Sequence, residues 1–150
     1  DTMYDAPGVG LAANQIGILQ QIIVIDVDFK VEGTDLDDRK IMNQNPRVFI
    51  NPEITKRTGS TNYNEGCLSV PGFYEDVRRF ANIEIRYQDL NGLTCELKAD
   101  GLLAIVLQHE IDHLNGRLFV DRLSLAKQSL VKSKARRKRN FDRSKFHVEL

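Results

Sequence analysis

Two histidines stand four residues apart in the run His109-Glu110-Ile111-Asp112-His113. On an α-helix, residues four apart share one face, so both imidazoles can reach a single metal ion. Glu110 directly follows the first histidine and can act as the base for a metal-bound water. These polar side chains interrupt an otherwise apolar helix, and burying them without partners is costly. The run therefore predicts a metal site that activates water.

A site with two histidine ligands needs a third protein ligand. In thermolysin-like zincins a Glu follows about 20 residues later, but residues 131–136 contain no acid. In metzincins the motif continues to a third His, and this chain has Phe119 there. The remaining candidates are His147 and Cys67. A thiolate with two imidazoles leaves one coordination position open, which is the catalytic arrangement.

Two further segments are unusual in their composition. The run Gly8-Val9-Gly10-Leu11-Ala12-Ala13-Asn14-Gln15 is rich in small residues, which allow a backbone to approach a ligand closely. It lacks the third glycine of a dinucleotide-binding fingerprint. Cys67 lies in the run Glu65-Gly66-Cys67-Leu68-Ser69. Alone, the first run predicts a tight turn and Cys67 a small buried side chain.

The elements that would position these residues follow from hydrophobic patterning. Apolar, β-branched runs predict strands over residues 20–27, 48–50 and 67–70, the last two ending at Asn51-Pro52 and Pro71-Gly72. The polar stretch 28–45 predicts a loop. Alternating residues over 83–87 and 93–97 predict a hairpin, with Asn91-Gly92 as a type I′ turn.

Two helices are predicted in the second half of the chain. One follows Asp100 as N-cap, is apolar on nearly every side, carries both histidines and stops at Asn115-Gly116. A helix that is apolar all round is a buried helix. The other covers residues 124–146, with Leu125, Leu130 and Val131 as docking residues. From Lys132 to Arg139 it is almost wholly basic.

Taken together, the three unusual segments resemble the three signature motifs of the peptide deformylase family. The family pattern is Gly-x-Gly-x-Ala-Ala-x-Gln, then Glu-Gly-Cys-Leu-Ser, then His-Glu-x-x-His. This chain matches all three in order between residues 8 and 113. The resemblance implies metal-dependent removal of the formyl group from the N-terminal formylmethionine of new polypeptides. The alternatives are a zincin-like metallopeptidase, with His147 as ligand, and a non-catalytic ribosome-associated module with a structural metal.

The resemblance implies a role for each matching residue. Cys67, His109 and His113 would hold one divalent ion, Fe²⁺ in the family, with Ni²⁺, Co²⁺ or Zn²⁺ able to substitute. Mixed thiolate and imidazole ligation suits all four ions. Glu110 would move the proton from water to the leaving amine. Gln15 and the backbone N–H of Leu68 would stabilise the oxyanion.

The remaining expected site residues contact the substrate. Gly10 and Gly66 would hydrogen-bond its backbone, and an apolar pocket for the methionine side chain would be lined by Val9, Leu102, Ile105 and Val106, with Tyr63 as a further candidate. A ligating histidine usually donates its other N–H to a carboxylate or a carbonyl. We expect Asp112 to be that partner, and Arg79 to pair with Glu65 or Asp112.

We expect a single α+β domain over residues 1–150, with antiparallel or mixed β-sheets around the buried helix. In the family a helix precedes the first motif, and Asp1–Tyr4 looks like its end, so the family's N-terminal segment is expected to be missing. No apolar run is long enough to span a membrane. Two cysteines provide no disulfide framework, which favours a cytoplasmic location.

The formal net charge of the chain is zero, and its two parts carry opposite charges. Residues 117–150 hold eleven Lys and Arg against three Asp and Glu, a net +8, and residues 1–116 carry −8. The balance excludes a chain that is basic throughout, and we expect no sequence-specific nucleic-acid binding. In bacterial deformylases the C-terminal helix contacts the ribosome. The resemblance therefore implies formylmethionyl nascent peptides and the ribosome as partners.

Overall fold

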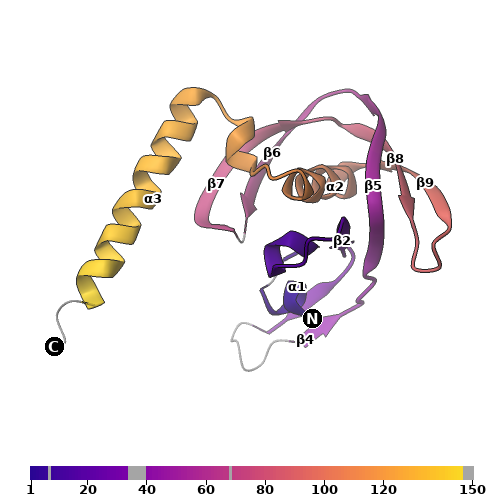
Figure 1. The fold of residues 1–150 in the computed structure, drawn as a ribbon, viewed down its shortest axis with the longest axis horizontal. Helices are drawn as coiled ribbons and strands as arrows, with labels where there is room; N and C mark the ends of the chain where they lie inside the picture. The colour runs from indigo at the N-terminus through magenta and orange to yellow at the C-terminus, as the bar shows by residue number, and fades with distance from the viewer. Residues whose placement is uncertain (7, 34–39, 68, 147–150) are drawn as a thin grey trace.

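The computed structural model describes residues 1–6, 8–33, 40–67 and 69–146 (Figure 1). The helices are α1 (Thr2–Asp5), α2 (Gly101–Leu114) and α3 (Leu125–Phe146), with 3-10 turns η1 (Ala13–Ile16) and η2 (Phe119–Arg122). The strands are β1 (Gly10–Ala12), β2 (Ile22–Ile25), β3 (Lys30–Glu32), β4 (Lys40–Met42), β5 (Arg47–Thr58), β6 (Thr61–Cys67), β7 (Val70–Arg79), β8 (Asn82–Gln88) and β9 (Thr94–Asp100). Mixed helices and antiparallel sheets confirm the predicted α+β class.

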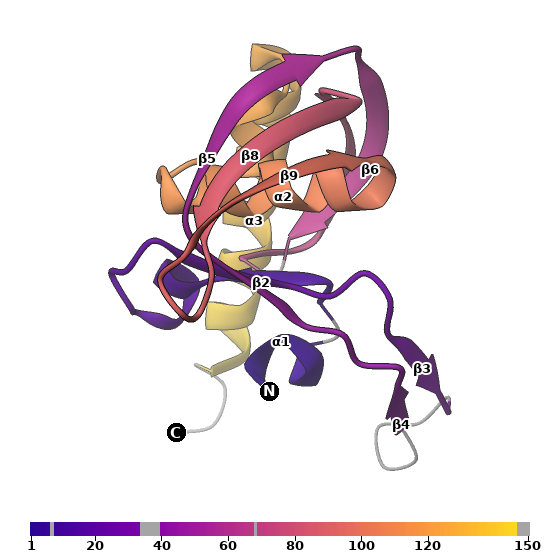
Figure 2. The same ribbon diagram turned by 90° about the vertical axis from the view of Figure 1, so that its right-hand side faces the viewer.

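The main sheet has five antiparallel strands in the order β1-β2-β5-β8-β9. Its inner face packs on α2, and Figure 2 shows β5, β8 and β9 arching over this helix. The shared core consists of Ala12, Ile23, Ile25, Phe49, Ile83, Ile85 and Ala99 from the sheet, with Ala104, Val106, Leu107 and Ile111 from α2. The alternating pattern of the strands therefore buries α2, as its all-round apolar sequence predicts.

A second, smaller core lies on the other side of α2. The antiparallel hairpin β6–β7 packs against η2 and the start of α3, and Figure 1 shows α2 between this hairpin and the main sheet. The buried residues of this core are Val77, Phe119, Val120, Leu123 and Val131. Cys67, Val70 and Phe73 pack against it. The start of α3 thus shares a core with the strand that carries Cys67.

Two strand predictions and one loop prediction are wrong in their limits. The strand predicted to end at Asn51-Pro52 continues to Thr58, because Asn51 adopts a positive φ of 50° and Pro52 falls where the register with β8 shifts. The strand predicted over 67–70 is divided instead: Cys67 ends β6 and Val70 begins β7, which runs on through Pro71-Gly72 opposite the register shift between Gly66 and Cys67. The predicted loop over 28–45 contains the small hairpin β3–β4.

The predicted β8–β9 hairpin is present, but its turn is not of type I′. Within the described residues, Asn91 does not have the positive φ that a type I′ turn requires, and only Gly92 does, at 77°. Instead, one carboxylate oxygen of Asp89 accepts the N–H groups of Asn91 and Leu93 at 2.8 and 3.0 Å. Asp89 therefore selects the longer loop over the two-residue turn.

The last helix leaves the body of the molecule (Figure 1). It begins one residue after the predicted start, and Ser124 O accepts the N–H of Gln128. Of the three predicted docking residues Val131 is buried, whereas Leu125 and Leu130 are 83% and 60% exposed. The prediction was wrong for both leucines because, among the described side chains, it is Val131 that packs against η2 and β7. No described helix is long and apolar enough to cross a membrane.

Asp26, which directly follows β2, joins three separate segments. Its carboxylate is buried and accepts the Tyr4 hydroxyl together with the backbone N–H groups of Asp28, Phe29 and Asn45. We expect Asp26→Asn to lower the free energy of unfolding by roughly 2–3 kcal/mol, because an amide NH₂ would face these donors. Urea denaturation measures the loss. The control Asp28→Asn, at an exposed carboxylate, changes it by less than about 1 kcal/mol; equal losses would contradict this role.

Candidate metal centre

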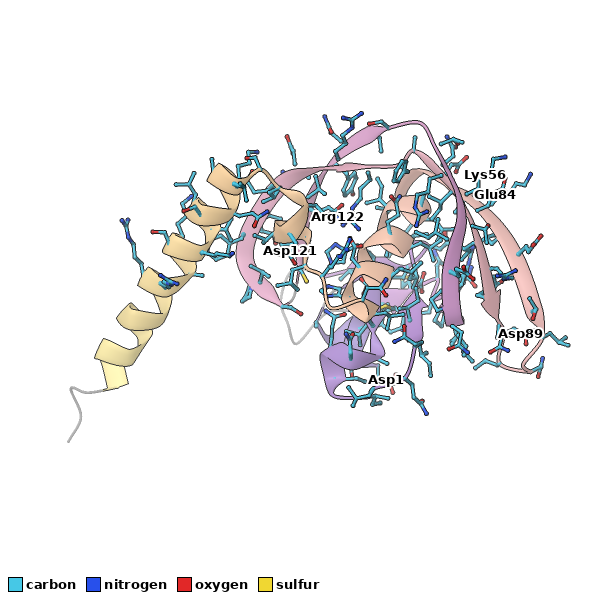
Figure 3. The ribbon with its side chains drawn as sticks, turned by 45° about the horizontal axis from the view of Figure 1, so that its top comes forward. Asp1, Lys56, Glu84, Asp89, Asp121 and Arg122 are labelled. Atoms are coloured by element: carbon cyan, nitrogen blue, oxygen red, sulfur yellow. The ribbon has the colours of Figure 1, made fainter. Side chains whose placement is uncertain are left out.

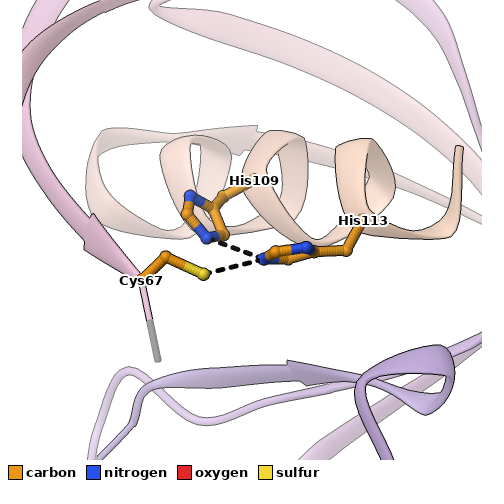
Figure 4. Close-up of side chains that lie close together, drawn as sticks. All are labelled: Cys67, His109 and His113. Atoms are coloured by element: carbon orange, nitrogen blue, oxygen red, sulfur yellow. Dashed lines mark hydrogen bonds between the residues drawn. The ribbon is translucent and has the colours of Figure 1, made fainter. Parts of the chain in front are cut away.

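The side chains of Cys67, His109 and His113 converge on one point (Figure 4). His113 Nε2 lies 3.1 Å from Cys67 Sγ and 3.1 Å from His109 Nε2. One sulfur and two ring nitrogens all lie within 4.8 Å of one another. This donor set and spacing fit a single transition-metal ion with a further position for water or substrate. The rival ligand His147 lies outside the described residues.

Secondary structure explains why these three groups meet. His109 and His113 lie one turn apart on α2, and the long hairpin β6–β7 carries Cys67 to the same side of that helix. The register of the hairpin shifts immediately before Cys67, where the ladder passes from Gly66↔Tyr74 to Cys67↔Val70. Such a bulge redirects the side chain that follows it.

Glu65, and not Asp112, orients the first histidine. His109 Nδ1 donates to Glu65 Oε2 at 2.8 Å, which leaves Nε2 for the metal position. Glu65 in turn accepts two hydrogen bonds from Arg79 at 2.6 and 2.8 Å. Asp112 is occupied by arginine and accepts Arg79 Nη1 at 2.6 Å. The expectation for Asp112 was wrong because the site is approached from β6, which a helix position alone does not reveal.

The protonation of the cluster favours a thiolate. Burial opposes ionisation of Cys67, but hydrogen bonds from His109 and His113 outweigh it and lower the pKa of the thiol to about 5. For His109, burial alone would lower the pKa, whereas hydrogen bonds to Cys67 and Glu65 raise it to about 10. Without an ion the cluster is therefore a thiolate beside an imidazolium near neutral pH.

Glu110 lies beside this cluster without full hydrogen bonding. Its side chain is buried, and among the described residues its Oε2 has no hydrogen-bond partner. Burial raises the pKa of this carboxyl to about 7. A buried carboxyl with a pKa near neutrality and a vacant oxygen can both accept and return a proton. The arrangement therefore supplies a base next to the metal position.

Gly10 leaves the room that Glu110 occupies. A Cβ atom at Gly10 would lie 2.7 Å from Glu110 Oε1 and 2.8 Å from Val106 Cγ1. Both contacts are too short for any side chain larger than hydrogen. Gly10 is the second glycine of the first motif, and Glu110 belongs to the third. The first motif needs glycine at this position because the Glu110 carboxyl approaches the backbone of β1 there.

Gln15 presents its amide NH₂ toward the cleft. Its Oε1 accepts the backbone N–H of Ala12 at 2.9 Å, and its Nε2 donates to Ser69 Oγ at 3.1 Å. Because the oxygen is held by the backbone of its own 3-10 turn, the orientation of the amide is fixed. Leu68, whose backbone N–H was predicted to stabilise the oxyanion together with Gln15, lies outside the described residues.

A cleft of about 430 Å³ opens beside the cluster. Its walls include all of the predicted pocket residues, Val9, Leu102, Ile105 and Val106, and also Tyr63. Gly10, Gln15, Gly66, Cys67, His109 and Glu110 face the same space. Val9 and Leu102 are each 37% exposed at the rim, whereas Ile105 and Val106 are buried. The three sequence motifs therefore meet around a single cavity.

Sequence reasoning missed two neighbours of the cluster. The ring of Phe119 stacks on that of His109 at 6.4 Å between centroids, and Arg122 pairs with Asp112. Both belong to η2, which folds back along α2. A helix stop at Asn115-Gly116 followed by apolar residues was visible in the sequence, but the direction of the returning chain was not.

A sequence profile described as polypeptide deformylase matches residues 1–129. The chain belongs to the polypeptide deformylase family. The deformylase of Chromobacterium violaceum is 47% identical over 138 residues, covering 92% of this chain and 75% of that protein. A peptide deformylase 2 of Xanthomonas axonopodis pv. citri is 48% identical over 138 residues, covering 92% of this chain and 74% of that protein.

Solved structures of deformylases have the same fold. That of Legionella pneumophila superposes with a TM-score of 0.77 at 42% identity, covering 95% of this chain and 77% of that one. The Synechococcus elongatus deformylase, solved in complex with actinonin, gives 0.75 at 46% identity, covering 89% and 68%. The resemblance drawn from the three motifs is confirmed at the level of the family. The deformylase family is metal-dependent, in keeping with the donor cluster.

We predict that metal binding at pH 6 releases about one proton from the protein. The pKa of His109 is about 10, so at pH 6 its imidazolium must lose a proton before it can bind the ion. The pKa of Cys67 is about 5, so at pH 6 its side chain is already mostly thiolate. The Glu110→Gln variant removes the nearby carboxyl that also titrates. Calorimetry of Zn²⁺ binding to this variant, in two buffers of different ionisation enthalpy, counts the protons. Affinity should rise about tenfold per pH unit; no proton release would contradict the thiolate–imidazolium pair.

Proposed function

We propose that this chain hydrolyses the N-formyl group of formylmethionine at the N-terminus of new polypeptides and releases formate. The observation that carries the proposal is the buried, unpartnered carboxyl oxygen of Glu110 beside the Cys67, His109 and His113 cluster. This oxygen would accept a hydrogen bond from the water molecule that attacks the formyl group. The apolar cleft that opens at the same point has the right character for a methionine side chain.

Cys67, His109 and His113 would hold the divalent ion. When bound, the ion supplies Lewis-acid chemistry, which acidifies water and polarises the formyl carbonyl. We expect Fe²⁺, and Ni²⁺, Co²⁺ or Zn²⁺ suit the same ligands. Glu110 takes the proton of the attacking water and passes it to the departing amine nitrogen. Its raised pKa suits both halves of this transfer.

Gln15 would stabilise the negative charge that develops on the formyl oxygen. Its Nε2 is directed into the cleft because Oε1 is occupied by the N–H of Ala12. A donor fixed before the reaction needs no reorganisation when the charge appears. The N–H of Leu68 remains predicted as the second donor.

The substrate backbone would lie between β1 and β6. β1 forms one edge of the main sheet and β6 belongs to a two-stranded hairpin, so each has a backbone edge without a strand partner within the described residues. An extended peptide can add to such edges by main-chain hydrogen bonds. Gly10 and Gly66 line the cleft on these two strands, and their backbone groups would hydrogen-bond the substrate backbone. The methionine side chain would then enter between Val9, Leu102, Ile105 and Val106.

The basic segment of α3 would bring the enzyme to its substrate. Lys132, Lys134, Arg136 and Arg137 are all exposed and lie within the two turns that follow the anchor Val131. Lys127, nearer the body, is paired with Glu75 at 2.8 Å. Exposed cations on a projecting helix suit the phosphates of ribosomal RNA. We place the activity in the cytoplasm, where nascent chains emerge.

Formate release from formyl-Met-Ala-Ser tests the catalytic proposal. We expect Glu110→Gln to lower kcat at least about 100-fold, as removal of a general base does, and Gly10→Ala to do the same by displacing Glu110. Both should retain bound Fe²⁺ or Ni²⁺. The control Gly92→Ala, in the β8–β9 turn, strains the backbone at a φ of 77° but does not line the cleft, and should leave kcat within twofold.

Undiminished turnover in Glu110→Gln would contradict the assignment of the base. A zincin-like peptidase would instead cleave unformylated peptides and keep its metal after Cys67→Ala. Absence of formate release by the metal-loaded wild type would overturn the proposed function altogether.

For α3, we expect glutamine at Lys132, Lys134, Arg136 and Arg137 to weaken ribosome binding at least about tenfold and to reduce its salt dependence. Formate release from the short peptide should stay within twofold, because these residues lie outside the cleft. Glutamine at Lys56, Arg57, Arg86 and Lys98 removes equal charge from the main sheet as a control. Equal weakening by both variants, measured by co-sedimentation across a salt series, would defeat the docking role.

A further inference from the structure

Four charged side chains connect His109 with the segment that precedes α3. Glu65 accepts the N–H of His109 and both bonds from the fork of Arg79. Arg79 Nη1 donates to Asp112 Oδ2 at 2.6 Å. Arg122 closes the chain from the other side: its Nε donates to Asp112 Oδ2 at 3.0 Å and its Nη2 to Asp112 Oδ1. The order along this charge network is therefore one histidine, then a carboxylate, a guanidinium, a second carboxylate and a second guanidinium.

Three members of this charge network are buried, and the four charges balance. The side chains of Glu65, Arg79 and Asp112 are only 3–7% exposed, and that of Arg122 is 40% exposed. Two carboxylates face two guanidinium groups, so the four side chains together carry no net charge. Removing the outermost cation would leave one buried carboxylate uncompensated, which is costly at such low exposure.

Arg122 is presented by a rigid segment. After α2, Gly116 adopts a φ of 70°, and the N–H groups of Gly116 and Arg117 bond to His113 O and Asp112 O in a Schellman motif. The chain is thereby turned back along α2. Three buried residues then hold η2 in the second core: Phe119, Val120 and Leu123. Figure 3 shows Arg122 on this turn, between α3 and the body of the molecule.

We propose that Arg122 is a positioning residue for the metal centre. It satisfies Asp112, and Arg79 can then keep two of its donors on Glu65. Glu65 held in this way fixes the ring of His109, with Nε2 toward the metal position. Without Arg122, Asp112 competes with Glu65 for Arg79, and the ring of His109 loses its restraint. This inference rests on the proposed role of Cys67, His109 and His113 as ligands.

Simple electrostatics predicts the opposite effect on metal binding. Removing a positive charge near a divalent cation strengthens its binding, whereas loss of the restraint on a ligand weakens it. Arg117 provides the matched control. It carries the same charge five residues away, is exposed, and within the described part of the chain bonds to Asp112 only through its backbone N–H. Alanine at Arg117 removes the charge and retains that bond.

The test is Co²⁺ affinity of the full chain, measured by competition with a chelator, together with the Co²⁺ absorption spectrum. We expect Arg122→Ala to weaken Co²⁺ binding about tenfold, the lower end for loss of an outer partner of a ligand. Its ligand-field bands should broaden. Arg117→Ala should bind as tightly as the wild type or slightly tighter. Arg122→Lys keeps the charge but loses the two-nitrogen fork of the guanidinium group. Its Co²⁺ affinity should lie between those of Arg122→Ala and the wild type.

In turnover, Arg122→Ala loaded with Co²⁺ should lower kcat and leave KM within twofold, because Arg122 does not face the cleft. Affinities of Arg122→Ala and Arg117→Ala that agree within twofold would overturn the inference. If circular dichroism shows that Arg122→Ala does not fold, Arg122→Lys decides, and wild-type affinity in that variant overturns the inference. A wild type that binds Co²⁺ without sulfur-to-metal absorption would instead overturn the proposed ligand set.

Discussion

A buried helix cannot carry two imidazoles and two carboxylates unless each of them finds a partner. On α2 these groups are His109, Glu110, Asp112 and His113, and the surrounding elements supply the partners. β6 brings Glu65 and Cys67, β7 brings Arg79, and η2 brings Arg122. One carboxyl oxygen, Oε2 of Glu110, is left over within the described residues. Among the described residues, Glu110 Oε2 is therefore the one buried side-chain nitrogen or oxygen without a partner, and it lies where the cleft opens.

The same constraint explains why the molecule has two cores. The main sheet covers the apolar side of α2 through Ile23, Ile85 and their neighbours. The polar side needs charged partners close to apolar support, and the hairpin β6–β7 with η2 provides both. Phe119 illustrates the combination, since it fills the second core and stacks on His109. Packing and site geometry therefore depend on one another, and substitutions in η2 should alter the geometry of the metal site.

The sequence was most informative where chemistry and local spacing coincide. The i, i+4 histidines, the glycine stop at Gly116 and the alternation of β8 and β9 are local patterns, and the structure has them where they were expected. Failures came from long-range geometry. The partner of His109 is Glu65 because β6 approaches from that side, and Pro52 stays within a strand because a bulge accommodates it. Neither fact is encoded within one segment.

The centre of this account is that one thiolate and two imidazoles hold the ion, with one further position open. X-ray absorption of the Zn²⁺-loaded protein tests it most directly. We predict one sulfur at about 2.3 Å and two imidazole nitrogens at about 2.0–2.1 Å, with a light atom completing the shell. A shell without sulfur, in a protein whose Cys67 still reacts with iodoacetamide after zinc is bound, would contradict it.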